Sequence, residues 1–317
     1  MSDRDLSRRR FLQASSVAVA AAAVPTAAAA DGDGWAVAET PVDSSLYDVE
    51  HTAAGAYAVG TGGVVVERTP RGWRKVLDGG PTGNGNNLYG ADVTDDGERL
   101  WFVGSSGAIG EYDVATGSLT SHSAPMDVTN NFNDVAVTGE AGAANVYVAG
   151  DSGKVYYSFE NGETGSWNYV TPGSGSAINA IDCYDDRKGH IVDGNKSVFH
   201  TADGETWDKI GLADANVNFY GVDSHGPADV WISGGGGMIF HWNGSEWVPA
   251  DTGDASLRDI EVTDAGDAGQ VVGGGGKTYA YEDRWVREST PVGQNLKAVA
   301  RGDTDIAVGA GGTVLER

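Results

Sequence analysis

The chain of 317 residues contains little cysteine, little lysine and no excess of positive charge. Its one cysteine, Cys183, excludes an intramolecular disulfide, and the apolar run around it predicts a buried structural thiol. Seven lysines and fourteen arginines stand against 45 acidic residues, and the formal net charge is -24. Because such a chain repels nucleic-acid backbones and anionic membranes, we expect neither as a partner.

Helical periodicity is also missing. Apolar residues do not recur every three or four positions, and Gly, Asp and Asn interrupt the chain every few residues. No apolar stretch reaches the roughly 20 residues that a transmembrane helix needs. These absences exclude a helical bundle and favour an all-β fold without a membrane span.

The first thirty residues form a segment of their own. The sequence Ser7-Arg8-Arg9-Arg10-Phe11-Leu12-Gln13 has the twin-arginine export pattern, and an Ala/Val-rich run and small residues suited to cleavage follow it. A short membrane anchor is the alternative, but the run is too short and is broken by Pro25. We predict that residues 1–30 are a twin-arginine signal, that residues 31–317 form one domain, and that the protein is secreted or extracytoplasmic.

The signal carries four Arg and two Asp, so the mature chain has a net charge near -26. The acid excess is mostly Asp in turn-like sequences, a composition that resembles proteins of salt-loving prokaryotes. We therefore interpret the acidity as a halophilic adaptation that keeps the surface hydrated, rather than as a binding signature.

Internal repetition is the strongest signal in the sequence. Seven units each open with an apolar residue, two others and a second apolar residue, at steps of 38 to 46 residues, which is the length of a four-stranded propeller blade. The openings are Leu46-Tyr47-Asp48-Val49, Leu88-Tyr89-Gly90-Ala91, Phe132-Asn133-Asp134-Val135, Ile178-Asn179-Ala180-Ile181, Phe219-Tyr220-Gly221-Val222, Leu257-Arg258-Asp259-Ile260 and Leu296-Lys297-Ala298-Val299.

Each unit except the fourth also contains Gly-x-x-Gly between two β-rich runs, as in Gly104/Gly107 and Gly234/Gly237. The fourth unit has Asp193 and Lys196 at these places. Paired glycines between strands predict tight hairpin turns, because glycine adopts positive φ at little cost. A phosphate-binding loop is the alternative, but it requires a following helix, and none is predicted.

Most units close with a strand that contains Trp, but the seventh unit stops at Arg317, one strand short. A matching strand, residues 34–38, stands at the start of the mature chain and resembles residues 72–76. We predict an all-β, seven-bladed β-propeller whose last blade is closed by the N-terminal strand of the mature chain.

Two segments carry a family resemblance. Residues 229–247 resemble the repeat unit of secreted WD40/YVTN/BNR-like propellers. Thr201-Ala202-Asp203-Gly204-Glu205-Thr206-Trp207 is similar to the Asp-box of BNR repeats and of photosystem II assembly-factor-like proteins, and is one residue shorter. The resemblance implies a structural turn in which Asp203 accepts N–H bonds and Trp207 packs. It covers the mature chain at the level of repeats and includes glycosidases, lyases and non-catalytic binders.

Catalytic and metal-binding patterns are weak. A sialidase-like enzyme would need an arginine cluster and a Tyr–Glu pair, but among the unit openings only Arg258 supplies an arginine and no Glu occurs. The acids of residues 92–98 lack the order of a calcium loop, and the six histidines lack metal-ligand spacing. We expect solvated turns there, no metal and no cofactor.

The second position of each opening should lie near the mouth of the central channel, beside amide-rich connecting loops that either bind a ligand or serve only as turns. Arg258 and Lys297 fall in adjacent units and would either pair with local acids such as Asp259 or bind an anionic group. The candidate ligand-binding residues are Tyr47, Tyr89, Asn133, Asn179, Tyr220, Arg258 and Lys297.

The sequence thus predicts a non-catalytic extracytoplasmic binding or assembly protein, monomeric, that holds a glycan, a peptide or a partner protein. The alternative is a carbohydrate-active hydrolase or lyase on the same scaffold. Asn195-Lys196-Ser197 and Asn243-Gly244-Ser245 are glycosylation sequons, and the sequence leaves their use open.

The acidic surface makes a prediction about salt. Self-repulsion of a chain with a net charge near -26 should destabilise the fold when ions are removed. We expect the thermal unfolding midpoint of the mature chain to rise from low to molar salt. A flat response would show that the acidity is no adaptation to salt.

Overall fold

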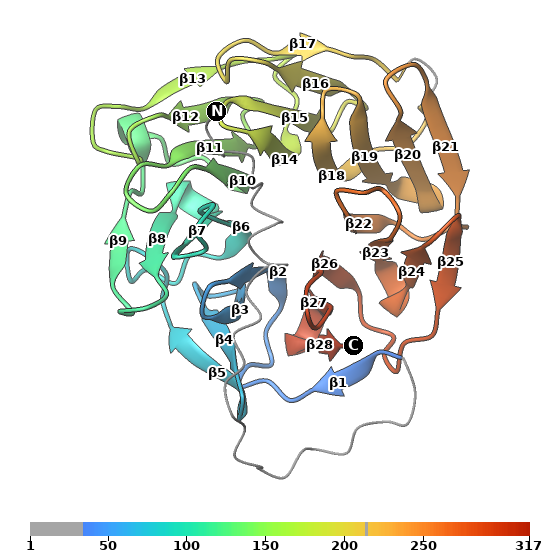
Figure 1. The fold of residues 1–317 in the computed structure, drawn as a ribbon. Helices are drawn as coiled ribbons and strands as arrows, with labels where there is room; N and C mark the ends of the chain where they lie inside the picture. The colour runs from blue at the N-terminus through green and yellow to red at the C-terminus, as the bar shows by residue number, and fades with distance from the viewer. Residues whose placement is uncertain (1–33, 213–214) are drawn as a thin grey trace, which may run out of the picture.

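The computed structural model describes residues 34–212 and 215–317, so the predicted export signal lies outside the described residues. Seven four-stranded antiparallel sheets surround a central axis (Figure 1). We number the blades 1 to 7 by the chain order of their inner strands. These inner strands are β2 (Leu46–Thr52), β6 (Leu88–Val93), β10 (Phe132–Thr138), β14 (Ile178–Asp185), β18 (Phe219–Gly226), β22 (Leu257–Val262) and β26 (Leu296–Ala300).

The remaining strands of each blade follow outward from the axis (Figure 1). The second strands are β3 (Gly55–Gly60), β7 (Arg99–Gly104), β11 (Asn145–Gly150), β15 (Lys188–Asp193), β19 (Asp229–Gly234), β23 (Gly269–Gly273) and β27 (Ile306–Gly309). The third strands are β4 (Val65–Thr69), β8 (Ile109–Asp113), β12 (Val155–Ser158), β16 (Val198–Thr201), β20 (Met238–Trp242), β24 (Thr278–Tyr281) and β28 (Val314–Glu316). The outer strands are β5 (Gly72–Leu77), β9 (Leu119–Ser121), β13 (Asn168–Val170), β17 (Asp208–Lys209), β21 (Trp247–Asp251), β25 (Trp285–Glu288) and β1 (Ala36–Ala38).

Short 3-10 turns complete the secondary structure of the described residues: η1 (Ser105–Gly107), η2 (Pro125–Asp127), η3 (Gly235–Gly237), η4 (Gly274–Gly276) and η5 (Ala310–Gly312). Four of them are the predicted Gly-x-x-Gly hairpins. At Gly107 φ is +73°, and an added Cβ would lie 2.3 Å from the carbonyl oxygen of Val128, so this turn requires glycine. In blade 4 Asp193 replaces the first glycine and its carboxylate accepts the N–H groups of Asn195 and Ser197.

The last blade takes its outer strand from the start of the described chain. Strand β1 pairs antiparallel with β28, with Ala36 opposite Glu316, and lies beside it in Figure 1. Glu316 then joins blade 7 to blade 1, because it accepts two bonds from the Arg68 guanidinium, at 2.9 and 3.0 Å, and one from Trp73 Nε1 at 2.8 Å. Burial alone would raise the pKa of Glu316, but these donors outweigh burial and lower it.

The apolar core lies between neighbouring blades. One cluster joins Val49 and Val66 of blade 1 to Ile306 and Val308 of blade 7, and equivalent clusters fill the other junctions. Cys183 is 7% exposed within one of them, so the predicted buried thiol is confirmed. Each sheet thus buries both faces against its neighbours, which a single blade cannot do alone.

Carboxylates hold the inner strands together at six consecutive junctions. Each accepts a backbone N–H from the inner strand of the following blade, at 2.6 to 2.9 Å. The pairs, in chain order, are Asp48 with Ala91, Asp92 with Val137, Asp134 with Ile181, Asp182 with Ser224, Asp223 with Val262, and Asp259 with Val299. Blade 7 has Ala298 and Ala300 at the equivalent positions.

We predict that Asp92→Ala destabilises the fold. The substitution leaves the N–H groups of Val93 and Val137 without their acceptor in a buried position, and each unsatisfied group costs about 1–3 kcal/mol. The expected loss, measured by urea denaturation in molar salt, is about 2–4 kcal/mol. Glu98→Ala, an exposed acid in the same segment, is the matched control and should change stability by less than about 0.5 kcal/mol. Equal effects of the two variants would contradict the structural role of Asp92.

Candidate functional site

A β-bulge occupies the same place in every blade. The pairing of each inner strand with its neighbour skips one residue, directly after the first residue of the inner strand. The skipped residues are Tyr47, Tyr89, Asn133, Asn179, Tyr220, Arg258 and Lys297. These are the seven residues that the sequence singled out as candidates. A bulge bends its strand and changes the direction of a side chain, so these residues are not constrained by pairing with the second strand.

Five of the seven side chains form a continuous arc across blades 5, 6, 7, 1 and 2, which we call the mouth arc: Tyr220, Arg258, Lys297, Tyr47 and Tyr89. The Arg258 guanidinium lies 4.2 Å from the ring centroid of Tyr220, and Lys297 Nζ lies 4.4 Å from that of Tyr47. The rings of Tyr47 and Tyr89 meet edge to face, 5.1 Å apart. Cations over aromatic faces are attracted by the ring quadrupole.

The two cations of the mouth arc are neighbours. Burial lowers the pKa of Lys297, and the charge of Arg258 lowers it further. Neither cation forms an ion pair with a carboxylate of the described residues. The pairing of Arg258 with Asp259, considered from the sequence, does not occur. The Asp259 carboxylate instead accepts the N–H groups of Ile260 and Val299, both at 2.8 Å.

The two remaining candidates, Asn133 and Asn179, form hydrogen bonds within the propeller. Asn133 Nδ2 donates to Asp151 Oδ1 and to the carbonyl oxygen of Ile178, both at 2.9 Å. Asn179 Nδ2 donates to the carbonyl oxygen of Phe219 at 2.7 Å. Both amides therefore bind the following blade, and the structure does not bring them into contact with the mouth arc.

Some of the asparagine side chains in the amide-rich loops stabilise turns. Three asparagine side chains accept a backbone N–H from the Gly-x-x-Gly turn of the preceding blade. The pairs are Asn87 with Gly62, Asn131 with Ser106, and Asn295 with Gly275, at 2.8 to 3.2 Å. For these three the structural interpretation holds, and their carbonyl oxygens are committed to the fold.

Three acids lie one residue beyond the bulge, in blades 1, 3 and 6. Burial raises the pKa of Asp48, Asp134 and Asp259, and repulsion among inner-strand acids raises it further. For Asp259 the pKa rises to about 7. Each of the three accepts two backbone N–H groups, its own neighbour's and one from the next blade.

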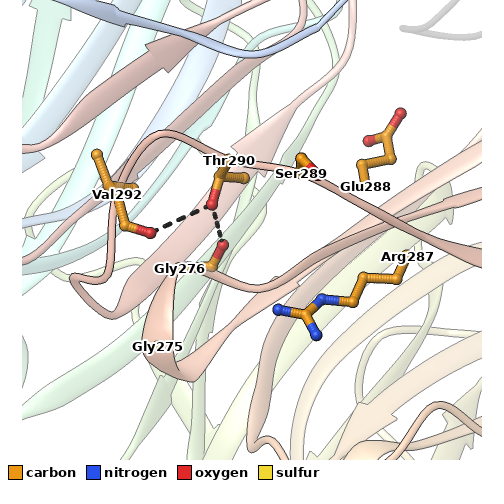
Figure 2. Close-up of a pocket in the computed structure, with 7 residues that line it drawn as sticks. All are labelled: Gly275, Gly276, Arg287, Glu288, Ser289, Thr290 and Val292. Carbon is orange, nitrogen blue, oxygen red and sulfur yellow. Dashed lines mark hydrogen bonds between the residues drawn. The ribbon is translucent and has the colours of Figure 1, made fainter.

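A polar pocket of about 340 Å³ lies between η4 and the end of β25 with the segment that follows it (Figure 2). Its lining residues are Gly275, Gly276, Arg287, Glu288, Ser289, Thr290 and Val292. Thr290 Oγ1 donates to the carbonyl oxygen of Gly276 at 2.5 Å, as Figure 2 shows. Asn295 contacts Gly275 of this pocket and precedes Lys297 of the arc by two residues. We predicted no role for Arg287 or Thr290 from the sequence. Thr290 nevertheless holds a recurring position, because Thr40 and Thr252 donate the same bond in other blades, each at 2.9 Å.

The other sequence candidates are structural. Asp95 Oδ2 accepts the N–H of Gly139, and Asp96 Oδ2 accepts that of Ala141, both at 2.9 Å, so this acidic turn binds blade 3. Asp203 accepts the N–H groups of Glu205 and Thr206, and these bonds lower its pKa to about 2. Among residues 34–212 and 215–317 no three potential metal ligands gather at one place.

No family model matches the chain, and no curated protein matches it. Solved structures do match it. "YCF48 bound to D1 peptide" is 14% identical with a TM-score of 0.70, over 91% of this chain and 96% of that one. YCF48 from Cyanidioschyzon merolae is 16% identical with a TM-score of 0.69, over 89% and 98%. The WD40 domain of Doa1 is 11% identical with a TM-score of 0.71, over 90% and 97%. The chain is a seven-bladed β-propeller.

At such low identity the structural similarity establishes the fold alone, and it confirms the predicted seven-bladed β-propeller. The propeller is similar in fold to the YCF48 and WD40 structures. In the described part of the propeller, no helix is long and apolar enough to cross a membrane.

The acids that follow the bulge predict a pH dependence. The pKa of Asp259 is about 7 in the folded chain, above its usual unfolded value of about 3.9. Its contribution to stability is therefore fully present below the unfolded pKa and is lost as the pH rises through 7. We expect the melting temperature at constant molar salt to fall between about pH 6.5 and 8.5.

Asp259→Asn should reduce this slope, because an amide does not ionise, and the remainder should come from Asp48 and Asp134, whose pKa values are also raised. Asp185→Asn, at an exposed acid whose pKa the Lys188 bond lowers, should leave it unchanged. His190 does not contribute to the slope between about pH 6.5 and 8.5. Burial lowers its pKa to about 3, so that its titration alters stability only below about pH 6.5. Parallel slopes for the parent and Asp259→Asn would refute the assignment.

Proposed function

We propose that this propeller is a non-catalytic, extracytoplasmic binding or assembly protein whose mouth arc holds an acidic group of a peptide or partner protein. The observation that carries the proposal is the state of Arg258 and Lys297. In a chain with a net charge of -24, two adjacent cations rest on tyrosine faces and form no ion pair within the described residues.

The chemistry of the arc suits a carboxylate. A guanidinium binds a carboxylate through two parallel hydrogen bonds, and a lysine ammonium adds a further charge-assisted bond. The Tyr220 ring lies against the guanidinium and the Tyr47 ring against the lysine, so little side-chain freedom is lost on binding. Tyr89 extends the aromatic surface for an apolar or ring-shaped neighbour of the acidic group.

A peptide or protein ligand has a precedent on this fold, because one similar structure is of YCF48 with a bound D1 peptide. A glycan with an acidic group would use the same cations and could stack on the same rings, so both classes belong in the binding test. The extracytoplasmic location rests on the twin-arginine pattern of residues 7–13.

The enzyme alternative would need a pair of carboxylates free to act as acid and base or nucleophile beside the bound group. The acids that follow the bulge, Asp48, Asp134 and Asp259, each accept two backbone N–H groups. Their raised pKa values have a structural cause in burial and mutual repulsion. These contacts favour binding over catalysis.

The experiment that tests the proposal is an array of peptides and glycans, with and without acidic groups, probed with purified residues 31–317 in molar salt. We predict that Arg258→Ala combined with Lys297→Ala weakens binding of acidic array members by about 1.5–3 kcal/mol per lost charged hydrogen bond. The melting temperature should fall only slightly, because each side chain contacts the neighbouring blade through a single cation–π contact, which is worth about 0.5–1 kcal/mol.

Lys209→Ala combined with Arg284→Ala is the matched control. It removes the same charge from exposed residues of outer strand β17 and of the β24–β25 turn, and it should leave binding intact. Retention of parental affinity by the Arg258/Lys297 variant would rule out the mouth arc as the binding site.

A further inference from the structure

Two sequons, at Asn195 and Asn243, lie in turns of different geometry. N-linked glycosylation needs an accessible asparagine amide and an accessible hydroxyl two residues later. If the chain is exported folded through the twin-arginine route, which is part of the proposed function, the modifying enzyme meets finished turns. Local structure then decides which sequon is used.

Asn243 lies in the hairpin between β20 and β21, where residues 243–246 are all exposed. Its Oδ1 accepts three bonds, from the N–H of Ser245 at 3.0 Å, the Ser245 hydroxyl at 2.8 Å and the N–H of Glu246 at 3.0 Å. Its Nδ2 donates to none of the described residues. The turn therefore polarises the amide carbonyl, places the sequon hydroxyl on the amide group and leaves the amide nitrogen open to solvent.

Asn195 lies in the β15–β16 turn, where the sequon is closed. Ser197 is 2% exposed, and its hydroxyl bonds to the carbonyl oxygen of Asn195 rather than to the amide side chain. Asp193 holds the N–H groups of both residues, at 2.9 and 2.8 Å. The hydroxyl that a glycosylating enzyme must reach is buried in the turn.

The surroundings of the two turns also favour modification of Asn243 over Asn195. The β15–β16 turn stands at the Gly-x-x-Gly position, on the face that carries the mouth arc, whereas the β20–β21 hairpin lies at the other end of its blade. A saccharide on Asn243 would leave the arc uncovered. Trp242 and Trp247 flank the hairpin with ring centroids 5.5 Å apart, and both are partly exposed, so apolar ring surface lies beside the modified amide.

We propose that Asn243 is an N-glycosylation site of the folded protein and that Asn195 is not modified. The sugar donor is a saccharide linked to a lipid phosphate. Asn243 Nδ2 forms a bond to the anomeric carbon, the bond from that carbon to the phosphate oxygen breaks, and the lipid phosphate leaves with the electron pair. The amide gives up one proton to a base of the transferase, so charge and atoms balance.

The test is peptide mass spectrometry on the full chain expressed in its natural host and recovered from the extracytoplasmic fraction. Trypsin separates the sequons, because residues 189–196 contain Asn195 and residues 210–258 contain Asn243. We expect the 210–258 peptide to carry a saccharide mass and the 189–196 peptide to be unmodified. Ser245→Ala should abolish the added mass, Ser245→Thr should keep it, and Asn195→Gln should leave it unchanged.

The fraction in which the chain is found separates the two proposals. Exported chain with an unmodified 210–258 peptide, or with the saccharide on Asn195, overturns this inference and leaves the proposed location intact. Chain retained in the cytoplasm with an intact N-terminus and no saccharide overturns both. Melting curves of the Ser245 variants, expected to match the parent, exclude a loss of mass through misfolding.

Discussion

The innermost strand of each blade has a sheet partner on one side only, and this edge is the constraint on which the rest of the structure depends. The N–H groups on its free edge point toward the axis, where no further strand can pair with them. The chain satisfies several of them with carboxylates from the preceding blade, as Asp92 does for Val137 and Asp134 for Ile181. A single side chain thus removes an unsatisfied donor and joins two blades. The junction from blade 7 to blade 1 lacks such an acid at the equivalent positions, and there Glu316, Arg68 and the β1–β28 pairing hold the ring at its outer part.

This solution determines the electrostatics of the centre. Acids that bridge inner strands repel one another, and burial and this repulsion raise the pKa of Asp48, Asp134 and Asp259. The backbone donors oppose this rise by favouring the ionised form. Arg258 and Lys297 lie directly before this level in the chain, on the face where the inner strands begin. They stand over tyrosine rings and form no ion pair within the described residues.

The sequence predicted what repeats within one unit and missed what joins two. Blade number, the hairpin glycines and the strand at residues 34–38 all recur at a fixed spacing, so they could be read directly. The role of Asp92 could not, because its partner Val137 lies 45 residues away, and a run of acids such as residues 92–98 looks the same whether it binds a cation, water or backbone N–H groups. The candidate residues at the second opening position were selected by position alone. Their shared β-bulge was not foreseen, since strand register leaves no mark in a single sequence. Asn133 and Asn179 hold the same position but contact the next blade. The residue type alone does not show whether an asparagine there binds a neighbouring blade or a ligand.

The bulge explains why this one position varies in chemistry around the ring. The first and fourth residues of each opening are apolar because they pack between blades, and the third or fifth is acidic at the junctions that a carboxylate bridges. The skipped residue takes part in neither, since it lies outside the ladder and its backbone makes no register pair. Tyr, Asn, Arg and Lys can therefore occupy it without disturbing the pairing on either side. The position is free to vary in chemistry, and Asn133 and Asn179 use it to donate a hydrogen bond to the following blade, whereas the residues of the mouth arc contact one another.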